Sequence, residues 1–136
     1  MDEVTINRKL DSLQRCLLRI SKKCPETVEP LITDIDLQDV LILNLTRAIQ
    51  LGVDLAAHIL ASQHLPPPET MGDTFVQLAR AGKISEALAA RLRKAVGFRN
   101  IAVHAYQEID WVIVHAICTR HLDDFRALAK VAAVSE

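Results

Sequence analysis

Residues 37–60 read LQDVLILNLTRAIQLGVDLAAHIL, and this stretch decides the fold class. Its apolar residues recur every three or four positions, which is the spacing of one helix face, and they fill two neighbouring stripes. One stripe contains Leu37, Leu41, Leu45, Ala48, Gly52, Leu55 and Ile59, and the other contains Ile42, Ile49, Val53, Ala56 and Leu60. A helix with so wide an apolar face packs on two partners, either helices of its own bundle or a second subunit.

Prolines and a capping residue delimit this helix and the segment before it. We expect Asp36 to cap the long helix, which continues to about His64 and stops before Pro66–Pro68. Upstream, an amphipathic helix ends near Cys24, because a residue that precedes proline disfavours the α region. Residues 25–35 then form a loop or one short turn.

The second half of the chain predicts three more helices. A short one covers residues 70–81, with Gly82 as the left-handed residue after it, and Ser85 caps the next. The last helix covers residues 110–134. Its inward residues are expected to be Ile113, Ala116, Ile117, Phe125, Leu128 and Ala132. The prediction is an all-α antiparallel bundle of four main helices plus one short helix, forming a single domain over residues 1–136.

Composition supports this fold class and indicates the cellular compartment of the protein. Leu and Ala supply 35 of 136 residues and aromatic residues only 4%, so a β-sandwich or barrel is disfavoured. Wholly apolar runs are a few residues long, so no membrane span is expected. The acidic N-terminus is unlike a secretory signal, and three widely spaced cysteines fit a reducing compartment, so we expect a cytoplasmic protein.

Charge is unevenly distributed although the net charge is only −1. Residues 24–79 contain eight acids against one Arg, whereas residues 80–106 contain six Lys and Arg against one Glu. A uniformly basic nucleic-acid binder is therefore excluded. Residues 80–106 are either a local basic surface or a solvated helix face.

Residues 97–106, GFRNIAVHAY, contain the candidate catalytic residues. The polar residues Arg99, Asn100, His104 and Tyr106 alternate with apolar ones. On an ideal helix Arg99 and His104 lie about 140° apart around the axis, so they share a cleft only if the helix distorts or ends between them. Gly97 makes distortion inexpensive. The alternative is an ordinary helix end with a hydrogen-bonded histidine.

Arg99, His104 and Tyr106 form the pattern R-x4-H-x-Y, which resembles the motif of the HepT toxin family in the HEPN superfamily of helical nucleases. The resemblance covers essentially the whole chain. Ala105 departs from the acidic residue of many relatives, but it is a spacer position. The agreeing context is Gly97-Phe98-Arg99-Asn100, Phe75…Leu78…Gly82-Lys83-Ile84, and Leu41-Ile42-Leu43-Asn44-Leu45.

This resemblance implies a fold, an activity and a partner. HepT-like proteins are small helical bundles that form homodimers and cleave RNA without a metal or other cofactor, as toxins of toxin–antitoxin pairs. The partner is a minimal nucleotidyltransferase antitoxin of the MntA type, which transfers AMP from ATP to the motif tyrosine, here Tyr106. No Gly-rich phosphate loop is visible, so the chain itself is not expected to bind ATP.

The residue types suit metal-free RNA cleavage, in which the ribose 2′-OH attacks the neighbouring phosphate. His104 would move protons near neutral pH, Arg99 would stabilise the pentacoordinate phosphate, and Asn100 would orient a phosphate oxygen or the histidine. One histidine does not easily serve as base and acid in one step, and a twofold dimer would supply a second. The alternative function is a catalytically silent domain that binds a nucleotidyltransferase; the intact Arg99/His104 pair favours the enzyme.

Two further polar sets are weaker candidates. His115, Cys118 and His121 have types that bind zinc, but the outer two lie about 240° apart on a helix and do not converge, so no metal site is expected. Asp54 and His58 have the i, i+4 spacing of a helix-surface pair.

Overall fold

All regular structure in residues 2–134 is helical in the computed structural model, which describes these residues. Residues 1, 135 and 136, at the ends of the expected domain 1–136, lie outside the described residues. The helices are α1 (Glu3–Lys23), α2 (Glu29–Thr33), α3 (Ile35–Ser62), α4 (Met71–Arg80), α5 (Glu86–His104), the 3-10 turn η1 (Tyr106–Glu108), α6 (Trp111–Arg120) and α7 (Leu122–Val134). The predicted all-α class is confirmed.

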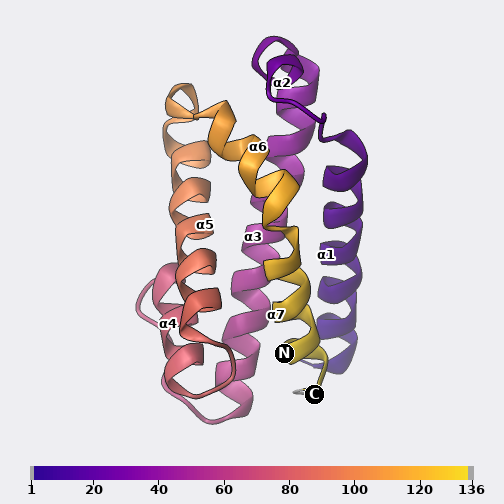
Figure 1. Cartoon of the computed structure of the whole chain (residues 1–136). Helices are drawn as coiled ribbons and strands as arrows, with labels where there is room; N and C mark the ends of the chain where they lie inside the picture. The colour runs from indigo at the N-terminus through magenta and orange to yellow at the C-terminus, as the bar shows by residue number, and fades with distance from the viewer. Residues whose placement is uncertain (1, 135–136) are drawn as a thin grey trace.

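Helix α3 lies at the centre of an up-and-down bundle (Figure 1). It packs against α1, α4, α5 and α7, and the short α4, at the lower left of Figure 1, also packs against α5. The antiparallel arrangement was expected, because loops of a few residues join most of the helices and force neighbours to run in opposite directions. The end of α5, η1 and the start of α6 meet at the upper left of Figure 1.

Both apolar stripes of α3 are buried, as predicted, apart from the half-buried Leu37 at its start. Gly52 shows why a small residue is needed in the first stripe. A Cβ atom there would lie 3.3 Å from Leu128 Cδ2 and 3.7 Å from Phe125 Cδ1, so α7 approaches α3 closely at this point. The last helix thus closes the core over α3.

Nearby side chains cap the helix ends, and one of the predicted caps is wrong. Asp34, not Asp36, caps α3, because the Asp34 side chain accepts a hydrogen bond from the Leu37 amide at 3.1 Å. The helix begins two residues earlier than expected, which makes Asp36 an acidic residue of its first turn. Ser85 caps α5 as predicted. Gly82 has a φ of +74° just after α4, also as predicted.

The single last helix expected over residues 110–134 is wrong, because the chain breaks at His121. Helix α6 crosses the end of the bundle, whereas α7 follows α3, and one straight helix cannot do both (Figure 1). Asp123 and Asp124 in the first turn of α7 favour a new helix N-terminus there. Ile113 of α6, expected to face inward, is 50% exposed.

Among the described residues, α3 is the one helix long and apolar enough to cross a membrane by length and composition. This qualifies the expectation drawn from short apolar runs, since mean hydropathy over a window can be high where polar residues interrupt it. The apolar stripes of α3 are covered by α1, α4, α5 and α7. Its apolar character is thus accounted for by its place in the core.

Candidate functional site

Helix α5 carries the motif and runs without interruption from Glu86 to His104. The expected distortion at Gly97 is absent: its position faces open space, and no packing contact requires the helix to bend there. The helix ends at His104, where Ala105 leaves helical geometry with φ −145° and ψ 56°. Therefore Arg99 and His104 belong to one regular helix, and the chain turns only after the histidine.

Arg99 and His104 do not meet within one chain. They are separated by five helical positions, which is about 140° of rotation and about 7.5 Å of rise. The Arg99 side chain is half-buried and the His104 side chain is exposed. Arg99 does lie beside Asn100, whose Oδ1 is 3.5 Å from the Arg99 Nη1 donor, at the long limit of a hydrogen bond. One protomer thus presents an Arg–Asn pair and a histidine on different sides of a helix end.

Tyr106 begins the η1 turn and is anchored to a distant part of the chain. Its hydroxyl donates a hydrogen bond to Asp39 Oδ1 of α3 at 3.3 Å, and its ring contacts Trp111 edge-to-face with centroids 6.2 Å apart. The side chain still leaves 41% of its surface exposed. Partial burial is the largest cause that raises the pKa of Tyr106, and the nearby Asp39 charge and hydrogen bond raise it further. The phenol is therefore protonated at neutral pH.

Asp39 was missed as a site residue by sequence reasoning. It lies 67 positions from Tyr106, and only the packing of η1 against the start of α3 brings the two together. An exposed aspartate near a helix N-terminus is common, so no local pattern distinguishes it.

Exposed apolar side chains surround the motif. They come from the end of α5 and the start of α6, and they are Ile101, Val103, Val112 and Ile113. Apolar residues grouped on a surface mark interaction sites more often than isolated ones do. The end of the bundle that bears His104 and Tyr106 therefore has the character of an interface.

The weaker polar candidates have other roles. His115 Nε2 lies 2.8 Å from the Pro25 carbonyl oxygen, and Cys118 is buried, where burial raises its thiol pKa. Within the described part of the chain, no three His, Cys, Asp or Glu side chains form a group that could hold a metal ion. The Asp54–His58 pair is wrong: Asp54 instead accepts hydrogen bonds from Lys9 Nζ at 2.7 Å and Gln50 Nε2 at 3.0 Å.

Sequence comparison relates almost the whole chain to nucleases. A family model described as ribonuclease HepT-like matches residues 13–132. The mRNA nuclease HepT of Shewanella oneidensis is 38% identical over 131 residues, which cover 96% of this chain and 97% of the relative.

Structural comparison agrees with the sequence comparison. A tri-AMPylated Shewanella oneidensis HEPN toxin, solved in complex with an MNT antitoxin, superposes with a TM-score of 0.89 at 36% identity, covering 98% of this chain and 99% of that one. A toxin–antitoxin structure with AMP-PNP gives a TM-score of 0.87 at 36% identity, covering 97% and 99%. The all-α HEPN-like fold expected from the motif is thereby confirmed.

Proposed function

Because this chain belongs to the family of HepT-like ribonucleases, we propose that it is the toxin of a toxin–antitoxin pair and cleaves RNA through Arg99, Asn100 and His104. One observation carries the proposal: an R-x4-H-x-Y motif lies at an exposed helix end, in a chain 38% identical over nearly its full length to a named mRNA nuclease. The proposed location is the cytoplasm, where RNA is available.

The reaction needs no group from outside the protein and the RNA. A histidine accepts the proton of the ribose 2′-OH, and the 2′-oxygen forms a bond to the adjacent phosphorus as the bond from phosphorus to the 5′-oxygen breaks. The leaving 5′-oxygen takes a proton, so the products are a cyclic phosphate and a 5′-hydroxyl. The Arg99 guanidinium stabilises the charge on the phosphorane oxygens, and Asn100, beside it, orients one of them.

We further propose that the site is completed in a twofold homodimer. Arg99 and His104 point to different sides of α5, so one chain offers only part of the constellation at each side. A second copy docked on the exposed Ile101, which lies about 60° from His104 around the α5 axis, would place two histidines at a shared cleft, one as base and one as acid.

Tyr106 is the proposed point of control by a minimal nucleotidyltransferase antitoxin of the MntA type. The phenol oxygen forms a bond to the α-phosphorus of ATP, pyrophosphate leaves, and the phenol proton passes to the Asp39 carboxylate. Two features support this assignment: the hydroxyl–carboxylate hydrogen bond and the exposure of the ring. The attached AMP adds negative charge and bulk beside His104, where an RNA phosphate must bind.

A catalytically silent, antitoxin-binding domain is not favoured as the alternative. The chain retains both Arg99 and His104, and the full-length relative is a named nuclease. A pure binding domain would have no chemical need for that pair.

Substitution of Tyr106 by Phe tests the control site. Tyr106→Phe keeps the ring contact with Trp111, so it should fold and cleave RNA, yet resist neutralisation by the antitoxin. Intact-mass measurement after co-expression with the nucleotidyltransferase should show added AMP on the native chain and none on the variant. Tyr106 is the only tyrosine, so equal modification of both proteins would place the acceptor on another residue type. Loss of cleavage in Tyr106→Phe would instead assign the hydroxyl to catalysis or folding.

A further inference from the structure

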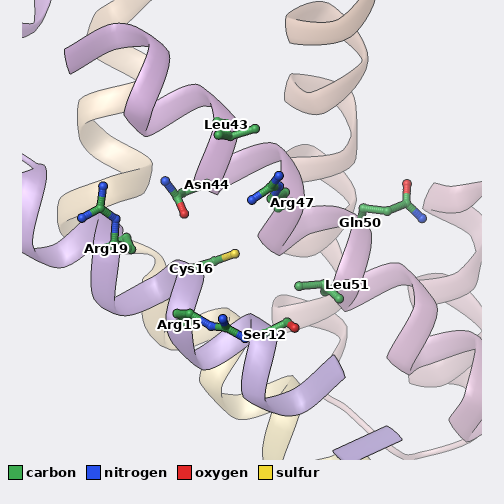
Figure 2. Close-up of a pocket in the computed structure, with 9 residues that line it drawn as sticks. All are labelled: Ser12, Arg15, Cys16, Arg19, Leu43, Asn44, Arg47, Gln50 and Leu51. Carbon is green, nitrogen blue, oxygen red and sulfur yellow. The ribbon is translucent and has the colours of Figure 1, made fainter. Parts of the chain in front are cut away.

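A basic groove lies between α1 and α3, formed by residues that the proposed cleavage chemistry does not use. Figure 2 shows Arg15, Arg19 and Arg47 arranged around Cys16 and Asn44. The groove has a volume of about 630 Å³. It is lined by Ser12, Arg15, Cys16, Arg19, Leu43, Asn44, Arg47, Gln50 and Leu51.

The three arginines of this groove carry positive charge without a counter-charge. None of them is in an ion pair among the residues that the structure describes, and no acidic residue lines the groove. The nearest acid along α3 beyond Gln50 is Asp54, and Lys9 already neutralises it at 2.7 Å. A cluster of three free guanidiniums is a preferred arrangement for phosphate groups, since each offers a planar pair of donors.

The apolar part of the lining distinguishes a polymer from a free inorganic anion. Leu43 is 49% exposed at the rim of the groove, and Leu51 lies half-buried further along α3. A nucleic-acid strand offers phosphates to the guanidiniums and apolar ribose and base surface to the leucines, whereas a free inorganic anion makes no apolar contact.

The groove and the control tyrosine share one face of α3. Asp39, which holds Tyr106, and the groove residues Leu43, Arg47 and Gln50 fall within an arc of about 80° on an ideal helix. Arg47 is eight positions from Asp39, or about 12 Å along the axis. An RNA strand at the motif would reach the groove within a few nucleotides.

We propose that this groove is an exosite that binds the phosphate backbone of the RNA substrate outside the cleavage site. The inference rests on the proposed ribonuclease function and adds to it a second point of substrate contact. Binding would be independent of sequence, because guanidinium–phosphate contacts position a strand without reading bases.

The test compares two triple variants that remove equal charge. The groove variant is Arg15→Gln, Arg19→Gln, Arg47→Gln, and the matched control is Arg80→Gln, Lys83→Gln, Lys130→Gln, whose positions do not line the groove. Each variant is assayed on a long single-stranded RNA and on an oligonucleotide that occupies the motif but is too short to reach the groove. The three single groove variants are assayed as well, in case the triple variant does not fold.

For the groove variant we expect KM on the long RNA to rise about tenfold, with kcat unchanged and cleavage of the short oligonucleotide unaffected. The slope of log affinity for the long RNA against log salt should become shallower by about 2, for three lost phosphate contacts on a single strand. Each single variant should show a smaller rise in KM, and the control triple should match the native protein.

Several outcomes would overturn the exosite while leaving the nuclease in place. These are an unchanged KM in the groove variant, an equal rise in the control, or unchanged RNA kinetics with lost antitoxin binding, which would make the groove a protein interface. A native protein that cleaves neither RNA would instead overturn the proposed function, and the exosite with it.

Discussion

The two halves of α5 differ in how many of their apolar side chains are exposed. The first half, residues 86–96, buries Leu88, Leu92 and Val96 against the rest of its own chain. The second half, residues 97–104, leaves Ile101, Val103 and His104 exposed while continuing the same regular helix. One helix therefore stabilises the fold along its buried face, which includes Phe98 and Ala102, while its second half also presents His104 and the exposed Ile101 and Val103.

The largest expected effect separates the two halves by stability. Leu92→Ala removes a side chain that is 1% exposed, so it should lower the free energy of unfolding by about 2–5 kcal/mol. Ile101→Ala removes a side chain that is 42% exposed, so the protomer itself should change by less than about 0.5 kcal/mol. Urea denaturation at several protein concentrations measures both and isolates any contribution from association. Equal losses in the two variants would contradict the contrast.

Activity should show the opposite dependence on the two halves. Arg99→Ala or His104→Ala should reduce RNA cleavage by about 10²-fold or more and abolish growth inhibition, because each removes a group that acts in the transition state. Lys94→Ala, an exposed cation of the first half, is the matched control and should cleave normally. Circular dichroism should show unchanged helix content in all three.

Chelation sharpens the same prediction. Cleavage by the native protein should persist in EDTA, since the proposed steps use only side chains. Full activity of His104→Ala, or loss of activity on chelation, would contradict the mechanism.

Association tests whether the second half of α5 is completed by another copy. Light scattering at micromolar concentration should give about twice the 15.1 kDa protomer mass, and Ile101→Asp should shift the population toward the protomer, because it places a charge in the apolar patch. An excess of His104→Ala should inhibit the native protein beyond simple dilution, since mixed dimers would have one histidine. A native protein that remains monomeric would exclude the shared cleft.

The smallest expected effect concerns the titration of Tyr106. Asp39→Asn removes a charge that disfavours the phenolate, so the Tyr106 pKa should fall toward its ordinary value of about 10, although burial, the larger cause, remains. Phenolate absorbance reads this residue alone, because the chain has one tyrosine. Asp36→Asn is the control and should leave the titration unchanged.

The sign of the pH dependence follows from the raised pKa. The contribution of Tyr106 to stability is present in full below about pH 10 and is lost as pH rises through the higher pKa of the folded state. Asp39→Asn should lessen this alkaline loss. An unchanged titration would mean that the hydrogen bond to Asp39 does not persist in solution.

The features that could be predicted from the sequence are those that depend on the local spacing of residues. The two stripes of α3, the Ser85 cap and the left-handed Gly82 each depend on residues within a few positions, so sequence was enough. The break at His121 was missed because α6 and α7 have compatible apolar spacing, and only their different packing partners separate them.

The site was predictable only in part for a related reason. The motif identified Arg99, Asn100, His104 and Tyr106 as candidates. It gave no access to Asp39, because a contact across 67 positions depends on how η1 packs on α3. The motif also did not predict the groove. Arg47 is the only Lys or Arg among residues 24–79, and it lines the groove together with Arg15 and Arg19 of α1.

The close approach of α7 to α3 at Gly52 also has a consequence for biosynthesis. Phe125, Leu128 and Ala132 of α7 are buried in the core, and they follow α3 in the chain, so they are translated after the face that they cover. Until they emerge from the ribosome, one face of α3 has nothing to pack against and the bundle cannot close. A nascent or truncated chain that lacks α7 would therefore have an incomplete core, so the nuclease would fold only after α7 has been translated.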